Sequence, residues 1–289
     1  METTEIEFEI AKNQIAIDFD SLEKEEIQEE ESLTLPKELI KPVNYDWINN
    51  EVLFVVARVN REEVCPNYSR LKLCGKTMTD WVLMAGGQCQ KIVIDDCEDV
   101  LSKLRNVDTD KKIIAVFYSD TPLLNKQAFY NIMDYFSSKS INFLQLSRGI
   151  IVKTEFLKNN PSFMSGSIGG YEDESLEIAD SAKTLYEMHK FLNKKILNYH
   201  ISNGVVIFGK KTVFIDADVE IDGGVVIYPN NVIEGQSIVE RGSVLGSGNI
   251  IKNSIISQNC QIEGAYIENS KIGQGKRVCS MTKVLNEEI

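Results

Sequence analysis

The feature that most restricts the fold of this chain is a six-residue repeat in its last third. Aliphatic residues recur at steps of six from residue 215 to residue 251, and the series continues to residue 278 at steps of five or six. Neither the 3.6-residue period of an α-helix nor the two-residue alternation of a hairpin produces such steps. The repeated residues are Ile215, Ile221, Ile227, Ile233, Val239, Leu245, Ile251, Ile256, Ile262, Ile267, Ile272 and Val278.

This period is typical of a parallel β-helix, in which three short strands make one triangular turn and the aliphatic side chains stack inward. An ordinary β-sandwich is the alternative interpretation. Gly, Asp, Asn and Ser lie between the aliphatic residues and tolerate the tight corners that such a coil needs. We expect residues 213–278 to form about three and a half turns. A second column of small or β-branched residues lies four positions after each aliphatic residue: Val219, Val225, Asn231, Ser237, Ser243, Asn249 and Ile255.

The middle of the chain alternates short apolar runs with amphipathic helical patterns. The apolar runs at 52–57, 91–95, 112–118 and 149–152 predict buried strands, and the pattern at 126–136 predicts a helix. This alternation favours an open α/β sheet, whose ligands bind at the carboxyl ends of the strands. A further helix over 181–200 would connect the sheet to the coil. Its apolar stripe is Leu185, Met188, Leu192, Ile196 and Tyr199.

The amino-terminal segment carries most of the charge. Residues 1–35 contain twelve carboxylates and two lysines, a net charge of −10 out of −12 for the whole chain. Charged and apolar residues alternate at 5–10 and 15–20, which predicts a two-stranded hairpin. The charged run at 23–31 predicts a solvated helix or a disordered linker. We interpret residues 1–45 as an acidic surface arm. The alternative is a docking arm or lid over a basic cleft.

Composition narrows the possible classes of protein. No stretch approaches the roughly 18 uninterrupted apolar residues that a membrane span needs, and the acidic start does not resemble a secretory signal. No basic surface is visible for nucleic acid. The cysteines form no Cys-x-x-Cys pair, so a structural zinc site is not expected. We therefore expect a cytoplasmic protein that binds neither membranes nor nucleic acid, with six reduced thiols: Cys65, Cys74, Cys89, Cys97, Cys260 and Cys279.

The order of parts along the chain resembles that of the bacterial bifunctional N-acetylglucosamine-1-phosphate uridylyltransferase / glucosamine-1-phosphate acetyltransferase family. In both, an α/β part is followed by a linking helix and then by a hexapeptide coil. Residues 198–207 (NYHISNGVVI) resemble the family's junction before the coil, and 219–222 (VEID) with 226–235 (VIYPNNVIEG) resemble its opening turns. Residues 73–82 (LCGKTMTDWV) resemble the segment after its phosphate loop, and 118–124 (YSDTPLL) resemble its metal-aspartate motif. The resemblance covers residues 50–278.

The resemblance implies a Rossmann-like nucleotidyltransferase sheet at 46–180, a linking helix at 181–204 and a short left-handed parallel β-helix at 205–289. It also implies a homotrimer and transfer of a nucleotidyl group from a nucleoside triphosphate to a sugar 1-phosphate, with release of pyrophosphate. In that chemistry Arg61 would be the catalytic residue that stabilises developing charge. Tyr68, Gly75 and Lys76 would lie at substrate-binding positions. Asp120 and Asp180 would hold Mg²⁺. From the residues alone, each aspartate could instead cap the helix that follows it, and Arg61 could be a solvated surface residue.

The chain departs from the family at several points. The phosphate loop at 57–61 contains no glycine, and Glu62 and Glu63 follow it. Tyr68, or its neighbour Ser69, replaces the essential lysine. The segment that reads the uracil base has no counterpart, and the sugar-pocket insertion before Gly149 is trimmed. We therefore expect a degenerate nucleotidyltransferase site, weak or inactive. The alternative is a pseudoenzyme: a non-catalytic nucleotide-sugar-binding, scaffolding or regulatory homotrimer. No acetyltransferase activity is expected, because the coil ends near where the acetyl-CoA site would begin.

Overall fold

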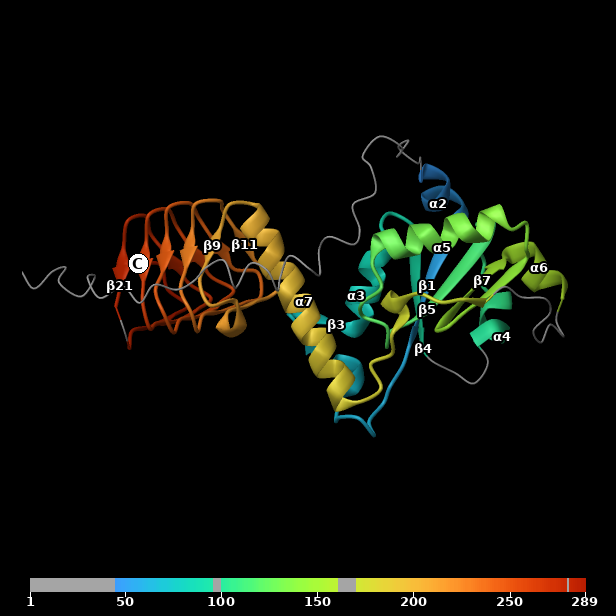
Figure 1. Ribbon diagram of the computed structural model, residues 1–289, viewed down its shortest axis with the longest axis horizontal. Coiled ribbons are helices and arrows are strands. Elements are labelled where there is room, and N and C mark those ends of the chain that lie inside the picture. Colours follow the sequence, from blue (N-terminus) through green and yellow to red (C-terminus); the bar gives the residue numbers. More distant parts are fainter. Residues whose placement is uncertain (1–44, 96–99, 161–169, 280) are drawn as a thin grey trace, which may run out of the picture. The chain divides into compact units, whose positions relative to one another are not determined.

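The computed structural model describes residues 45–95, 100–160, 170–279 and 281–289. The expected hairpin, the rest of the acidic segment before Tyr45, and Cys97 lie outside the described residues. The described chain contains the expected α/β sheet, followed by a helix and a coil of parallel strands (Figure 1). None of the described helices is both long and apolar enough to cross a bilayer.

The α/β sheet has three parallel strands, the outermost of which forms one edge, and an antiparallel pair and a short final strand continue it to the other edge. β5 and β4 lie on either side of β1 and run parallel to it, whereas β7 is antiparallel to β5 and forms a hairpin with β6. The four strands expected from apolar runs are all present, and β1 and β5 are buried almost throughout. The expected burial of 91–95 was wrong: β4 lies at the edge of the sheet, and its residues are exposed or half-buried. In spatial order the strands are β4 (Gln90–Asp95), β1 (Val52–Arg58), β5 (Ile113–Tyr118), β7 (Gly149–Lys153), β6 (Phe143–Leu146) and β8 (Gly170–Tyr171).

Helices cover both faces of this sheet, which explains why its central strands are apolar on both sides. On one face α3 (Met78–Ala85) and α5 (Lys126–Ser138) pack over the strands, and the Phe129 ring meets Phe54 edge-on with centroids 5.0 Å apart. On the other face lie α4 (Val100–Arg105) and α6 (Thr154–Asn159). The shorter elements are α2 (Asp46–Glu51), η2 (Tyr68–Arg70), β2 (Lys72–Leu73), β3 (Lys76–Thr77) and η3 (Glu174–Leu176).

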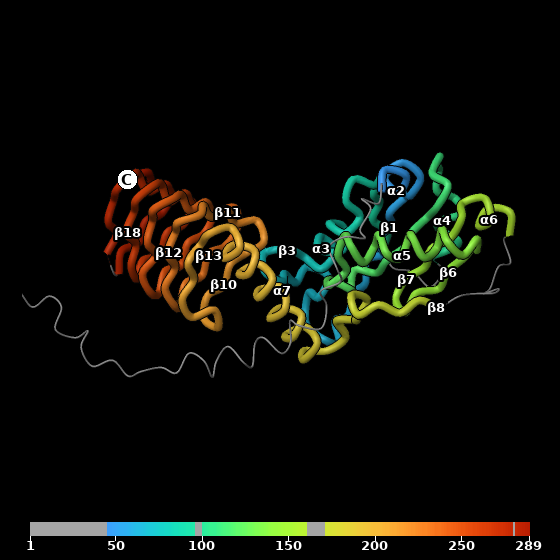
Figure 2. The backbone as a smooth tube through the Cα atoms, turned by 45° about the horizontal axis from the view of Figure 1, so that its top comes forward, coloured from blue at the N-terminus to red at the C-terminus, as the bar shows by residue number. Residues whose placement is uncertain are grey.

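The coil consists of three parallel sheets whose strands recur once per turn, and Figure 2 shows its turns stacked from orange to red. Phe214 pairs with Val232, eighteen residues later, as three six-residue repeats per turn require. One sheet contains β9 (Val206–Ile207), β12 (Val226–Ile227), β15 (Val244–Leu245), β18 (Gln261–Ile262) and β21 (Arg277–Val278). The second contains β10 (Phe214–Ile215), β13 (Val232–Glu234), β16 (Ile250–Lys252), β19 (Tyr266–Glu268) and β22 (Lys283–Leu285). The third contains β11 (Glu220–Ile221), β14 (Ile238–Val239), β17 (Ile255–Ile256) and β20 (Lys271–Ile272).

The inward stacking of the repeat is confirmed, because all twelve repeated aliphatic residues are buried. The coil is longer than the expected 213–278, since β9 precedes this range and β22 follows it. One residue of the predicted second column, Ile255, was wrong. After the shortened step the buried residue is Ser254, and Ile255 faces partly outward. Losing one residue moves the next side chain to the opposite face of a strand, because strand side chains alternate.

The linking helix α7 (Ala182–Ser202) changes its buried face along its length. Its first half buries the expected Leu185, Met188 and Leu192. Its second half instead buries Asn193, Leu197 and His200, whereas Tyr199 is 67% exposed, so the expectation for Tyr199 was wrong. The Asn193 side chain donates to the carbonyl of Val213 at 3.1 Å, and Leu197 packs into the coil core. The buried stripe turns because the second half of the helix packs against the coil.

Candidate functional site

The sheet topology gathers three loop residues at one edge. β1 and β5 are parallel, so they end at the same edge, and β7 begins there because it runs antiparallel to β5, with Gly149 opposite Phe117. Arg61 follows β1, Asp120 follows β5, and Arg148 immediately precedes β7. This is the carboxyl edge of the parallel strands, where open α/β sheets bind their ligands.

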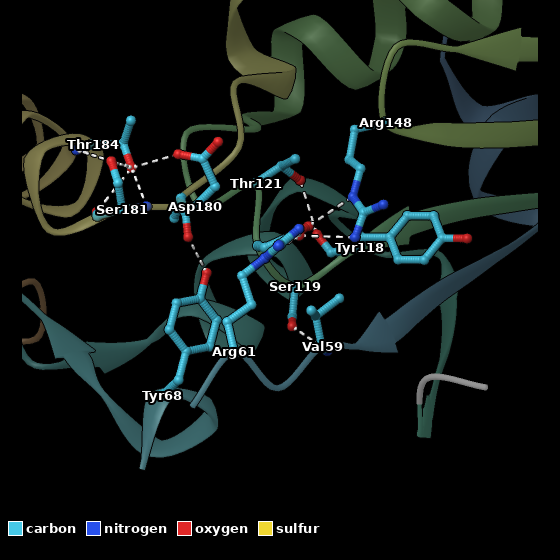
Figure 3. Close-up of polar contacts among 12 residues, drawn as sticks. Val59, Arg61, Tyr68, Tyr118, Ser119, Thr121, Arg148, Asp180, Ser181 and Thr184 are labelled. Carbon is cyan, nitrogen blue, oxygen red and sulfur yellow. Dashed lines mark hydrogen bonds and ion pairs between the residues drawn. The ribbon is translucent and has the colours of Figure 1, made fainter. Parts of the chain in front are cut away.

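These residues form an arginine–aspartate cluster, defined here as Arg61, Asp120 and Arg148 (Figure 3). Arg148 donates from Nε to Oδ1 of Asp120 at 3.0 Å and from Nη2 to Oδ2 at 2.8 Å. Arg61 donates from Nε and Nη2 to the same Oδ2, at 3.2 and 2.9 Å. One carboxylate therefore accepts four charge-assisted hydrogen bonds from two guanidinium groups.

The cluster presents positive charge to solvent. The Asp120 side chain is fully buried, whereas each arginine side chain is 24% exposed. The hydrogen bonds to Asp120 raise the pKa of Arg61, so this guanidinium stays charged. With two positive charges and one negative charge, the cluster has a net charge of +1, and the carboxylate of Glu63 lies 3.9 Å from Nη1 of Arg61 at its rim.

Neighbouring groups hold the cluster in place. The Arg148 guanidinium carbon lies 4.0 Å from the centre of the Tyr118 ring, a cation–π contact. The Ser119 hydroxyl accepts from the amide of Val59 at 2.9 Å, which ties the turn after β5 to the loop after β1. The amide of Ala179 donates to the carbonyl of Asp120 at 2.8 Å. The turn that contains Asp120 is thus anchored through both its backbone and its side chain.

Tyr68 is a packing residue in this structure. Its side chain is fully buried in a cluster with Leu73, Met78 and Leu185, and its hydroxyl donates to the carbonyl of Ala179. Burial first, and then the charge of Asp120, raise the pKa of the Tyr68 hydroxyl, which remains a neutral donor. The ring has no exposed surface for a ligand to contact, and its predicted substrate-binding role stays a prediction.

Asp120 and Asp180 do not fit a magnesium site in this arrangement. Both oxygens of Asp120 already accept N–H groups, and Asp180 accepts a hydrogen bond from the Thr184 hydroxyl at 3.3 Å, toward which its carboxylate turns in Figure 3. Among the described residues, no group of three or more His, Cys, Asp and Glu side chains is arranged to hold a metal. Magnesium is commonly held by one or two carboxylates together with water and substrate phosphates, but here N–H donors already engage both oxygens of Asp120.

The two aspartates are not helix caps either. The N-cap of α5 is Asn125, whose side chain accepts from the amides of Gln127 and Ala128. The N-cap of α7 is Ser181, in a reciprocal capping box with Thr184. The helix-capping alternative for Asp120 and Asp180 was therefore wrong, because a better-placed residue follows each aspartate.

Gly75 and Lys76 lie against the coil. They belong to the β2–β3 hairpin, and Lys76 pairs with Asp218 at 2.6 Å. Gly75 has a φ of +84°, and a Cβ there would lie 2.6 Å from Cγ of Asp216, so only glycine allows this close approach. No hydrogen bond or ion pair of the described residues joins these two residues to the arginine–aspartate cluster. Their predicted substrate-binding role is untested, and their observed contacts are with the coil.

Sequence reasoning missed Arg148. The residue lies in the turn between β6 and β7, and no motif marked it. The available signal was Gly149, which has a φ of +147° and lies so close to β5 that a Cβ would meet the Val116 carbonyl at 2.6 Å. A glycine at the start of an apolar run indicates close backbone contact with a neighbouring strand. That contact places Arg148 beside the end of β5.

No family model matches the chain, and no curated protein matches it. Solved structures with some similarity include a CMP:2-keto-3-deoxy-manno-octonic acid synthetase complexed with CTP, at 11% identity over 50% of this chain and 98% of that chain, with a TM-score of 0.38. A 4-diphosphocytidyl-2C-methyl-D-erythritol synthase from Anaerococcus prevotii has 5% identity over 49% and 97%, with a TM-score of 0.37. A protein from Mycobacterium tuberculosis has 11% identity over 48% and 96%, with a TM-score of 0.35. Similarities this low establish neither a family nor a substrate.

Proposed function

We propose that this protein is a sugar-nucleotidyltransferase-like protein that binds the phosphate groups of a nucleotide or nucleotide sugar at Arg61 and Arg148. Its nucleotidyl transfer is weak or absent. One observation carries the proposal: two solvent-reaching guanidiniums converge on one buried carboxylate at the carboxyl edge of the sheet.

The chemistry of the cluster suits phosphate. A guanidinium is planar and always charged, and its parallel N–H donors match two oxygens of a phosphate group. The described part of the chain offers this net positive spot at the edge where open α/β sheets bind ligands, in a protein whose total charge is −12. The resemblance of residues 50–278 to a uridylyltransferase family suggests which phosphate compounds to test first.

Weak transfer follows from what surrounds the cluster. In the transfer reaction, a phosphate oxygen of the sugar 1-phosphate would attack the α-phosphorus of the nucleotide, and the bond to pyrophosphate would break. This step needs backbone donors around the triphosphate and charge stabilisers at the α-phosphate. The loop at 57–61 has no glycine, and Tyr68, which replaces the family's lysine, is buried and neutral.

The first prediction concerns turnover. With UTP, N-acetylglucosamine 1-phosphate and Mg²⁺, pyrophosphate release should be undetectable or at least a thousandfold slower than the roughly 1 to 10³ per second of ordinary enzymes. The measurement is pyrophosphate release by purified full-length protein. A rate in the ordinary range that Arg61→Gln abolishes would contradict this part of the proposal.

The second prediction concerns binding. UDP-N-acetylglucosamine or UTP should bind saturably in calorimetry, and Arg148→Gln should weaken binding roughly ten- to a hundredfold, because a charge-assisted contact is lost. Arg58→Gln is the matched control. Arg58 also lies at the end of a strand, but it pairs with the exposed Asp95 and should be neutral. Absence of binding by every nucleotide and nucleotide sugar tested would overturn the proposed function.

A further inference from the structure

We infer that the arginine–aspartate cluster holds its phosphate ligand without a divalent metal, with Arg61 and Arg148 supplying the positive charge that a metal ion would supply. This inference rests on the proposed function and specifies how that site holds its ligand. Asp120 is then a positioning residue for the two arginines rather than a metal ligand.

The hydrogen-bond capacity of Asp120 is the first argument. Three of the four N–H donors of Arg61 and Arg148 converge on Oδ2 of Asp120 and the fourth reaches Oδ1, so both oxygens of the carboxylate are engaged. A metal ion would have to displace at least one guanidinium to reach an oxygen. The displaced guanidinium would lose its only anionic partner within the cluster.

Access is the second argument. The Asp120 side chain has no exposed surface, whereas the two arginine side chains that contact it are partly exposed. Magnesium usually keeps several of its water ligands when it binds protein, so it needs open space beside the carboxylate. An approaching ligand instead meets the guanidiniums first.

The unused donors are the third argument. All four contacts to Asp120 use the Nε and Nη2 atoms of the arginines. Among the described residues, Nη1 of Arg148 makes no hydrogen bond, and Nη1 of Arg61 lies 3.9 Å from the largely exposed carboxylate of Glu63. A phosphate group can therefore accept hydrogen bonds from the Nη1 atoms while Asp120 still holds the opposite side of each guanidinium.

Substitution of Asp120 separates the two roles by the buffer in which binding is lost. If Asp120 holds a metal, Asp120→Asn should remove only the part of ligand binding that depends on Mg²⁺. If Asp120 positions the arginines, Asp120→Asn replaces one of the two acceptor oxygens by an N–H donor that faces the guanidiniums. Binding should then weaken by the same factor in EDTA and in Mg²⁺, roughly tenfold. Arg148→Lys keeps the charge but loses the two-pronged contact, and it should weaken binding in both buffers alike.

The experiment is calorimetry of the full chain with UDP-N-acetylglucosamine, and separately with UTP, in excess EDTA and in Mg²⁺. We expect the dissociation constant for UDP-N-acetylglucosamine in EDTA to equal that in Mg²⁺ within about threefold. Binding only in Mg²⁺ would overturn the inference and leave the proposed function standing. No binding in either buffer would overturn the proposed function itself.

Direct metal titration keeps the inference testable in every case. When Mn²⁺ is titrated into the protein without nucleotide, electron paramagnetic resonance should detect no saturable Mn²⁺ site. A site lost in Asp120→Asn would overturn the inference even if nucleotide binding is absent. Circular dichroism of each variant checks folding. If Asp120→Asn does not fold, the EDTA comparison and the Mn²⁺ titration on the unaltered protein decide the question.

Discussion

Single residues in this protein take their roles from their neighbours more than from their type. Asp120 has the sequence context of a metal ligand, yet two arginines engage both of its oxygens. At Cys74, burial and then the charge of Asp216 raise the pKa of the thiol to about 12, which favours the protonated form. Reactivity at both positions is set by what packs against the side chain.

The third prediction concerns His200, which is buried near the end of α7 and whose pKa is lowered by burial. The unfolded chain binds a proton there near the ordinary pKa of about 6.5, whereas the folded protein does so only at lower pH. Stability should therefore fall as pH drops below about 6.5, until the folded pKa is passed. His200→Gln should reduce the difference between urea midpoints at about pH 7.5 and about pH 5.5. The only other histidine, His189, provides the control His189→Gln, and an unchanged difference in the His200 variant would contradict the argument.

At the scale of elements, the coil has a polar ladder inside one corner. Asn249 is fully buried, donates to the side chain of Asn231 at 2.8 Å and accepts from the amide of Ala265 at 3.0 Å. Its amide nitrogen also donates to the carbonyl of Gly246 at 2.8 Å. These bonds satisfy backbone groups that the corners remove from the strand ladders, so the two asparagines stabilise successive turns.

The fourth prediction follows from that ladder. Asn249→Ala should lower the free energy of unfolding by at least about 2 kcal/mol, because it leaves several buried polar groups unpaired at about 1–3 kcal/mol each. Urea unfolding followed by circular dichroism measures the change. Ser247→Ala, at an exposed position two residues earlier, is the control and should change stability by less than about 0.5 kcal/mol. Equal stability of the two variants would show that the ladder does not stabilise the coil.

At the scale of the whole molecule, the outer surface of the coil is partly apolar. Phe214, Val232, Ile250 and Tyr266 stand next to one another on adjacent strands of the second sheet. Phe214 is 41% exposed and Ile250 is 38% exposed. An apolar column of this kind favours association with further copies of the chain.

The fifth prediction is that the protein is a homotrimer. Light scattering at micromolar concentration should give three times the chain mass of 32.6 kDa. The double variant Phe214→Glu with Ile250→Glu should shift the mass toward that of one chain, since like charges would then face an association surface. Ser247→Glu, at an exposed corner, is the matched control for added charge. A single-chain mass for the unaltered protein would contradict the prediction.

The coil and the central strands could be predicted from the amino-acid sequence, because both depend on local periodicity. Twelve aliphatic residues at steps of six or five can all be buried only if the chain turns once per three repeats, and the apolar runs of β1 and β5 require cover on both faces. The arginine–aspartate cluster could not be predicted in this way, because it forms through contacts between distant segments of the chain. Arg61 and Arg148 lie 59 and 28 residues from Asp120 along the chain. Arg61 meets Asp120 because β1 runs parallel beside β5, and Arg148 meets it because β7 runs antiparallel beside β5. An apolar run predicts a buried strand but not its direction, so the pattern of residues could not show that Arg148 reaches the edge where β1 and β5 end.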